Sequence, residues 1–312
     1  MPRRASRRSS SGVGPLVSLI ALILFAAAAW WWLLRPQPHP VARYVFHTVV
    51  PSAEPAAPVA TPVPTPFATP LPTAAPASPA PTLTPAANLH GPQLALIVDD
   101  CGQWIATERG FVALEIPLTL SVLPDVPYTS VIATEASDAG KGVMLHLPME
   151  TLSGLNPGPG KVTTEMSDPQ IVAQVQSDLA DVPLARGVNN HEGSKASADP
   201  RVMRAVIGVL AQHNLFFIDS RTNAASVGEA TARAMGVPTA GRDVFLDNRA
   251  DVAYTEAQLS QAAEIAQRTG SAIAIGHPRP TTLTAVRAMI PRLQALGIRF
   301  VLAQDLAGKN AP

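Results

Sequence analysis

The sequence has a single cysteine and no net charge, and both absences narrow its possible roles. A lone cysteine, Cys101, excludes an intramolecular disulfide and any metal site built from several cysteines. Because 23 basic residues balance 23 acidic ones, the charge gives no indication of a nucleic-acid partner. We interpret Cys101 as a small, partly buried residue rather than a nucleophile, since no feature of the sequence assigns it a base.

Charged residues are also missing from Ser9 to Leu34, which includes the apolar segment Pro15–Leu34. At about 1.5 Å per residue, a helix of that length spans roughly 30 Å, the hydrocarbon thickness of a bilayer. Four arginines precede the segment, within residues 1–14, whereas only Arg35 and Arg43 follow it closely. This asymmetry predicts a transmembrane anchor at 15–34, a cytoplasmic basic tail at 1–14 and an extracytoplasmic remainder, periplasmic or at the cell surface.

A cleaved signal peptide is the alternative, because Ala26–Ala29 offers small residues for a cleavage site. The apolar run continues through Trp30–Leu34, with tryptophans where an aromatic belt would lie, and this favours an uncleaved anchor. Under both interpretations, the rest of the chain is exported from the cytoplasm.

Periodicity is lacking in residues 35–92, which are rich in Pro, Ala and Thr and almost uncharged. Half of the 32 prolines lie there. Such a segment cannot bury enough surface to fold, and proline favours an extended chain. We predict a disordered linker that lets the following domain reach the neighbouring layer of the cell envelope.

From residue 93 to 312, short apolar runs alternate with longer amphipathic stretches. This alternation predicts an α/β domain with a parallel sheet, either a (β/α) barrel, complete or incomplete, or a doubly wound sheet. We predict helix starts at Asp168, Asp199, Ser226 and Thr255. We also predict a helix that is kinked or split at Pro291 and ends at Gly297. The predicted strands are Leu94–Val98, Leu118–Leu123, Val143–Leu147, Gly187–Asn190, Leu215–Ile218, Val244–Leu246, Ala272–Ile275 and Arg299–Leu302.

Polar clusters stand at the ends of six of these strands. Ligand sites form beyond the carboxyl ends of parallel strands, so we expect the clusters to converge. His213 instead precedes a strand, and we expect it at the surface of the opposite end. The clusters are Asp99-Asp100, His146, Asn189-Asn190-His191, Asp219-Ser220-Arg221, Asp247-Asn248 and His277-Pro278-Arg279.

Each cluster has a purely structural alternative, and only convergence on one face favours function. The aspartate pair could cap a helix, and a strand-end histidine could be a packing residue. Asp219 and Arg221 could form an ion pair, and Arg279 could be a solvated turn residue.

The residue types at these strand ends indicate metal-assisted hydrolysis. One carboxylate and two imidazoles form a three-ligand site for Zn²⁺ or a similar ion, with positions left for water and substrate. A second carboxylate can accept a proton from that water, and a further histidine can protonate a leaving group. Sequence motifs for other classes, such as a Gly-rich phosphate loop or a Gly-x-Ser-x-Gly elbow, are missing.

Five motifs in this order resemble the divergent polysaccharide deacetylases, a branch of the polysaccharide deacetylase superfamily, over about residues 93–305. The resemblance implies a distorted (β/α) barrel with about seven parallel strands. It also implies metal-dependent N- or O-deacetylation of a polysaccharide. The motifs are Ile97–Gly102, His146–Glu150, Gly187–Ser194, Phe217–Thr222 and Ile275–Pro280.

The resemblance also implies roles for individual residues. Asp99 corresponds to the general base and His277 to the general acid. Asp100 and His146 correspond to metal ligands, but the second histidine of the superfamily's His-x-x-x-His pair is replaced by Glu150. His191, from the next strand, then completes the ligand set. The residues expected to position the substrate are Glu150, Asn190, Asp219, Arg221 and Arg279.

The leading hypothesis is a membrane-anchored extracytoplasmic hydrolase that deacetylates a cell-envelope polysaccharide, with zinc as the expected metal. The change at position 150 motivates a second hypothesis, a non-catalytic glycan-binding or scaffold module that retains the barrel. A third is a metal-dependent hydrolase of another bond, such as a phosphoester. The sequence indicates a glycan and the membrane as partners, and it identifies no protein partner.

Overall fold

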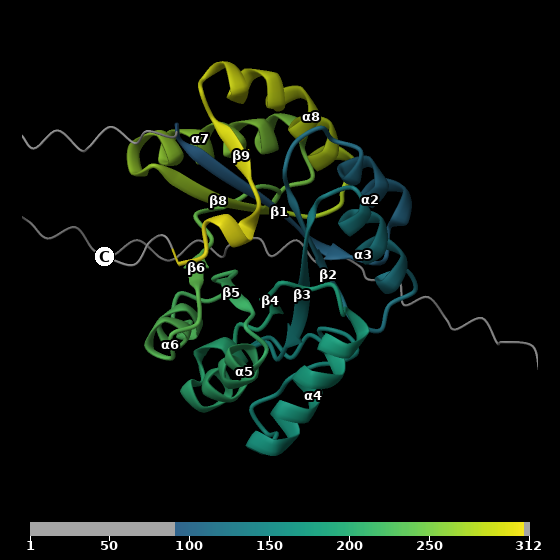
Figure 1. Cartoon of the computed structure of the whole chain (residues 1–312), viewed down its shortest axis with the longest axis vertical. Helices are drawn as coiled ribbons and strands as arrows, with labels where there is room; N and C mark the ends of the chain where they lie inside the picture. Colours follow the sequence, from purple (N-terminus) through teal and green to yellow (C-terminus); the bar gives the residue numbers. More distant parts are fainter. Residues whose placement is uncertain (1–90, 309–312) are drawn as a thin grey trace, which may run out of the picture. The chain divides into compact units, whose positions relative to one another are not determined.

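A computed structural model describes residues 91–308 of the chain (Figure 1). None of the helices within these residues is both long and apolar enough to cross a membrane. The predicted basic tail, the anchor and nearly all of the linker lie outside the described residues, so they stay predictions.

A single sheet of nine strands forms the centre of the domain, and all its neighbours pair in parallel. All eight predicted runs are strands or parts of strands at nearly the expected bounds. The strands are β1 Gln93–Cys101, β2 Thr119–Val122, β3 Gly142–Met149, β4 Gly187–Glu192, β5 Phe216–Asp219, β6 Thr239–Gly241, β7 Val244–Phe245, β8 Ser271–Gly276 and β9 Arg299–Val301.

The strand order is β6-β5-β4-β3-β2-β1-β8-β7, which is the cyclic order of a (β/α) barrel with its ladder open between β6 and β7. Of the two predicted architectures, the structure therefore has the distorted barrel. The expected number of about seven strands is too low. The strand that the sequence analysis missed is β6, whose three residues contain no apolar run. The last strand, β9, pairs with the first three residues of β1, on the edge that β2 pairs with further along.

Helices surround the strands on the outside of the sheet (Figure 1). Two short 3₁₀ turns, η1 Ala196–Ala198 and η2 Ala303–Asp305, accompany them. The helices are α2 Ile105–Val112, α3 Thr129–Asp138, α4 Asp168–Asp181, α5 Pro200–Gln212, α6 Gly228–Ala234, α7 Val252–Thr269 and α8 Pro280–Ala295.

Only one of the predicted helix starts has the expected cap. The Asp199 carboxylate accepts hydrogen bonds from the first turn of α5, as predicted. Ser167, not Asp168, caps α4, and Thr255 lies inside α7, where its hydroxyl donates to the Asp251 carbonyl. Of the two alternatives predicted at Pro291, a kink or a split, the split is wrong, because α8 continues through that residue.

Both faces of the sheet are buried, and alternate residues of each strand face different cores. Leu94, Leu96 and Val98 of β1 pack outward against the helices. Ala95 and Ile97 point into the barrel, where η2 closes the interior with Ala303 and Leu306. Burial on both faces explains why the strands appear in the sequence as continuous apolar runs.

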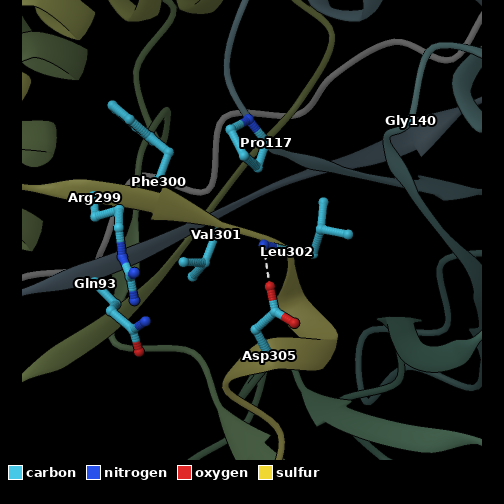
Figure 2. A pocket seen from close by; sticks show the side chains of 8 residues that line it. All are labelled: Gln93, Pro117, Gly140, Arg299, Phe300, Val301, Leu302 and Asp305. Carbon is cyan, nitrogen blue, oxygen red and sulfur yellow. Dashed lines mark hydrogen bonds between the residues drawn. The ribbon is translucent and has the colours of Figure 1, made fainter. Parts of the chain in front are cut away.

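A pocket of about 470 Å³ opens beside β9 at the amino ends of the strands (Figure 2). Gln93, the first residue of β1, contributes to its wall, whereas the Asp99-Asp100 pair lies at the other end of the same strand. The pocket is therefore separate from the predicted site. Its lining residues are Gln93, Pro117, Gly140, Arg299, Phe300, Val301, Leu302 and Asp305.

Asp178 in α4 is a buried carboxyl whose Oδ2 has no hydrogen-bond partner among the described residues. Its Oδ1 accepts one bond, from Gln174 Nε2 at 2.9 Å. Burial, with Asp181 and Asp125 nearby, raises the pKa of Asp178 from 3.8 to about 7. The folded state thus binds this proton more tightly than the unfolded state, and stability falls as pH rises from about 4 to about 7.

Asp178→Asn is therefore expected to raise the free energy of unfolding by about 1–3 kcal/mol at pH 8 and by little near pH 4. Urea denaturation of the two proteins at both pH values measures the difference. Asp138→Asn, at an exposed carboxylate of α3, is the control and should show no such pH dependence. An Asp178→Asn variant no more stable than wild type at pH 8 would contradict the expectation.

Candidate metal centre and active site

The period-two alternation of the strands brings five polar side chains into one mouth of the barrel. Asp99 follows Ile97 by two residues on β1, and His146 follows Met144 by two on β3, so both continue the inward-facing series. His277 follows Ile275 of β8 in the same way. Asn189 and His191 share the inward side of β4, as the contacts of their side chains with His146 show.

Asp100 joins this group only because β1 is irregular at its end. The pairing of β1 with β2 shifts register between Val98 and Cys101, and Asp100 has φ 57°. Behind the turn, the buried Glu108 accepts hydrogen bonds at its Oε1 from the backbone N–H groups of residues 102, 103 and 104, at 2.9, 3.0 and 2.7 Å. Glu108 thereby fixes the turn that places Asp100 beside Asp99.

Asp100, His146 and His191 form a group suited to a metal ion. Asp100 Oδ1 lies 2.8 Å from His191 Nδ1 and 3.2 Å from His146 Nε2, and the two ring nitrogens lie 3.1 Å apart. Three ligands each about 2.1 Å from one ion are separated by about 3.0–3.4 Å, close to these values.

The hydrogen bonding around these atoms also fits a cation. Asp100 Oδ1 is buried and accepts no hydrogen bond of good geometry from any described residue, despite its two close nitrogens. Burial would raise the pKa of Asp100, but His191 and His277 hold it well below its usual value, so the group is a carboxylate. An anionic oxygen without a donor, facing two imidazole nitrogens, is the donor set of a three-ligand divalent site.

His277 is held by a buried carboxylate on the opposite side of the mouth. Its Nδ1 lies 2.9 Å from Asp247 Oδ1, and its backbone N–H donates to Asp247 Oδ2 at 2.8 Å. Thr282 Oγ1 also donates to Asp247 Oδ2. His277 Nε2 is left facing Asp100 Oδ2 at 3.7 Å. Burial would lower the pKa of His277, but Asp100 and Asp247 raise it to about 9.

Asp99 lies between the histidines and is not part of the three-ligand group. Its Oδ2 is 3.6 Å from His146 Nε2, and its Oδ1 accepts a hydrogen bond from Asn189 at 2.8 Å. Burial raises the pKa of Asp99, whereas His146, His277 and the Asn189 bond act in the opposite direction. A carboxylate with this raised basicity next to a metal site can accept a proton from water.

The residues predicted to position the substrate lie mostly outside this cluster. Asp219 and Asn190 fall on the outward side of their strands and hold loops: Asp219 accepts from Ser226 Oγ, and Asn190 Oδ1 accepts from the Ser220 N–H. Arg221 pairs with Glu229 at 2.7 Å rather than with Asp219.

Glu150 and Arg279 lie at the rim with their own partners. Glu150 pairs with Lys195 at 2.8 Å and accepts two hydrogen bonds from Thr164, which together lower its pKa to about 2 although burial acts in the opposite direction. Arg279 precedes α8 and donates to the Asp247 carbonyl at 2.5 Å. Glu150 is not among the three grouped ligands.

Asn189 and Asp247, which contact the site's histidines, belong to predicted strand-end clusters, but the sequence predicts no role for them. The signal that could have found them is strand alternation, since Asn189 is two residues before His191 and Asp247 two after the inward Phe245. His213 is exposed at the end of α5, as predicted. Cys101 is more buried than expected, at 0% exposure, and burial raises the pKa of its thiol well above the usual value, which excludes a ready nucleophile.

The open barrel and its candidate metal centre place the chain among (β/α)-barrel proteins with a strand-end site. The chain belongs to the divergent polysaccharide deacetylase family, whose sequence model matches residues 96–307. This confirms the family resemblance of the five motifs.

Three relatives with known sequences or structures match between 64% and 72% of this chain. The chain is 34% identical over 201 residues to an uncharacterized protein of Haemophilus influenzae, covering 64% of this chain and 72% of that protein. It is 36% identical over 201 residues to the uncharacterized protein YibQ of Escherichia coli, of whose length it spans 63%. An uncharacterized protein of Agrobacterium tumefaciens shares the fold, with a TM-score of 0.67 at 22% identity, covering 72% of this chain and 92% of that one.

Zinc would bind the folded three-ligand group and not the unfolded chain, so it is expected to stabilise the full chain against heat. At about 100 times its dissociation constant, the gain is about 2.7 kcal/mol, or several degrees in Tm. His191→Ala should abolish this shift. Glu150→Gln, which breaks the pair with Lys195, should lower the starting Tm but keep the shift. If Glu150→Gln lost the shift and His191→Ala kept it, the third ligand would be Glu150.

Proposed function

We propose that this protein is a metal-dependent hydrolase that removes acetyl groups from a cell-envelope polysaccharide. The observation that supports it most is the grouping of Asp100, His146 and His191 close to the carboxylate of Asp99 and the imidazole of His277. Membership of the divergent polysaccharide deacetylase family supports the substrate class.

In this proposal, a divalent ion would be held by Asp100 Oδ1, His146 Nε2 and His191 Nδ1, and the two imidazoles and one carboxylate favour zinc. Bound there, the ion would supply Lewis-acid polarisation of an acyl carbonyl and of a water molecule. Asp99 accepts the proton of the attacking water. It is suited to this role because it lies beside the ligands without being one of them, and Asn189 holds it in place.

His277 donates a proton to the departing nitrogen or oxygen of the sugar. Asp247 bonds Nδ1, so Nε2 is the nitrogen that faces the site. It lies 3.7 Å from Asp100 Oδ2, at the end of β8 beside the end of β1 that carries Asp99. Hydrolysis of an amide or ester requires a base that accepts a proton from water and an acid that protonates the leaving group. Arg279 and Glu150, at the rim, are proposed to contact the sugar.

The proposal also includes an anchored position outside the cytoplasm. It rests on the apolar segment Pro15–Leu34, the arginines before it and the Pro-rich residues that follow.

Acetate release from a panel of acetylated glycans by the zinc-loaded full chain tests the chemistry. Asp99→Asn and His277→Gln are each expected to lower kcat by about 10²–10⁴-fold, since each removes one proton-transfer group. His213→Gln, at the opposite end of the barrel, is the matched control and should retain the wild-type rate.

Each other outcome selects a different function. Zinc and glycan binding without acetate release would favour the non-catalytic binding module. Release of phosphate from a phosphoester panel, without acetate from glycans, would favour the other hydrolase class. Wild-type rates in Asp99→Asn would overturn its role as the base.

The membrane topology has its own test in bacterial cells that express the full chain. The chain is expected to stay in the membrane pellet after carbonate extraction, because an apolar helix spans the bilayer. Protease added outside the membrane should digest the domain. A shortened chain in the soluble fraction would show instead that cleavage occurs near Ala26–Ala29.

A further inference from the structure

We infer that Asn189 is a positioning residue that fixes the tautomer of His146 and so prepares His146 Nε2 to bind a metal ion. The inference rests on the metal centre of the proposed function and is independent of its substrate.

Asn189 is completely buried at the centre of the site, where its carboxamide contacts four side chains. Nδ2 donates to Asp99 Oδ1 at 2.8 Å and to Ser220 Oγ at 3.2 Å. Oδ1 accepts a hydrogen bond from Ser121 Oγ and lies 2.9 Å from His146 Nδ1. A carboxamide has two N–H donors and two lone pairs on its oxygen, so these contacts use all four.

The orientation of the amide follows from Asp99. An ionised carboxylate offers only lone pairs, so the Asn189 atom 2.8 Å from Asp99 Oδ1 has to be the nitrogen. The amide oxygen then faces His146 Nδ1. Because that oxygen cannot donate, Nδ1 must carry the hydrogen of their contact.

The tautomer of His146 decides which of its nitrogens can bind metal. A neutral imidazole has one N–H, so a hydrogen on Nδ1 leaves the lone pair on Nε2. Nε2 is the atom that lies 3.2 Å from Asp100 Oδ1 and 3.1 Å from His191 Nδ1. The opposite tautomer would direct an N–H into the metal group. Asn189 therefore favours the one form of His146 that can act as a ligand.

The sheet holds this arrangement rigidly, because the participating residues belong to adjacent strands. His146 and Asn189 are register partners of β3 and β4, and Ser121 belongs to β2 beside them. The same amide also holds Asp99, so the proposed base and one ligand share a single support. Removal of the hydrogen-bond partner of a metal-ligating histidine typically lowers metal affinity by about 10–100-fold.

Nitrogen NMR of the zinc-free full chain, labelled with ¹⁵N at its histidine rings, reads the tautomer directly, with His146→Gln to assign the signals. Burial would lower the pKa of His146, but nearby Asp99 and Asp100 raise it, so the spectrum is recorded at alkaline pH, where the ring is neutral. There we expect a protonated Nδ1 and an unprotonated Nε2 at His146 in the wild type. In Asn189→Leu the two nitrogens should give averaged shifts, because both tautomers are populated. The zinc dissociation constant of this variant, from competition with a chelator, should rise about 10–100-fold.

Two further variants separate positioning from a general loss of packing. Asn189→Asp keeps an oxygen opposite Nδ1, and a proton shared between its other oxygen and Asp99 Oδ1 replaces the amide N–H, so it should keep the wild-type tautomer. Thr119→Val removes a buried hydrogen bond to the Ala303 N–H from the other end of β2, and it should change neither readout. If Asn189→Leu does not fold, Asn189→Asp decides the question.

The inference is overturned if Asn189→Leu keeps the wild-type tautomer and zinc affinity, or if Asn189→Asp loses that tautomer. Because the spectrum is recorded without zinc, it tests Asn189 even if the wild type binds no metal. In that case the proposed function fails separately.

Discussion

The site depends on bringing two consecutive carboxylates to the same side of one strand. In a regular strand, successive side chains point to opposite faces, so Asp99 and Asp100 could not both reach the barrel mouth. The register shift at the end of β1 and the positive φ of Asp100 remove this restriction. A non-glycine residue adopts such a φ only where its surroundings support it. Here the support is Glu108, whose Oε1 accepts three backbone N–H groups of the turn.

Much of the fold could be predicted because strands buried on both faces are continuous apolar runs, and because α/β alternation leads to parallel pairing. The convergence of Asp99, His146, His191 and His277 follows from the same rule, since parallel strands end on one edge. Position at a strand end did not predict the roles of Asp219 and Asn190. The alternation of side chains along their strands directs both outward, where they bond to loops. The turn at Asp100 breaks alternation and depends on Glu108, eight residues on and in a helix, so the sequence pattern could not reveal it. β6 was missed because its three residues form a strand through their pairing with β5 and do not form an apolar run.

A buried amide and a buried carboxylate set the orientation of two of the imidazole rings at the barrel mouth. Asn189 contacts Nδ1 of His146, and Asp247 contacts Nδ1 of His277, so in both rings the Nε2 atom is turned toward the centre. The chemical nature of the partner then separates the two histidines. Asp99 and Asp100 raise the pKa of His146 although burial acts in the opposite direction, and its Nδ1 has only a neutral amide as partner. Asp100 and Asp247 raise the pKa of His277 to about 9, and the Asp247 carboxylate contacts its Nδ1 directly. Two histidines in one cluster are thereby suited to different tasks.

The glutamate at position 150 does not remove the third ligand, because β4 can supply it. His191 and Pro148 are register partners on adjacent parallel strands, so a side chain on β4 reaches the mouth at the same height as the end of β3. The His191 Nδ1 atom comes within 3.1 Å of His146 Nε2 from this neighbouring strand. Position 150 is then free to take a supporting part, and the Glu150 carboxylate joins Lys195 to Thr164 across the loops beside the site. In a barrel, candidate ligands must end at the same height and point inward, but they need not lie on one strand. The change at position 150 is therefore compatible with the candidate three-ligand group.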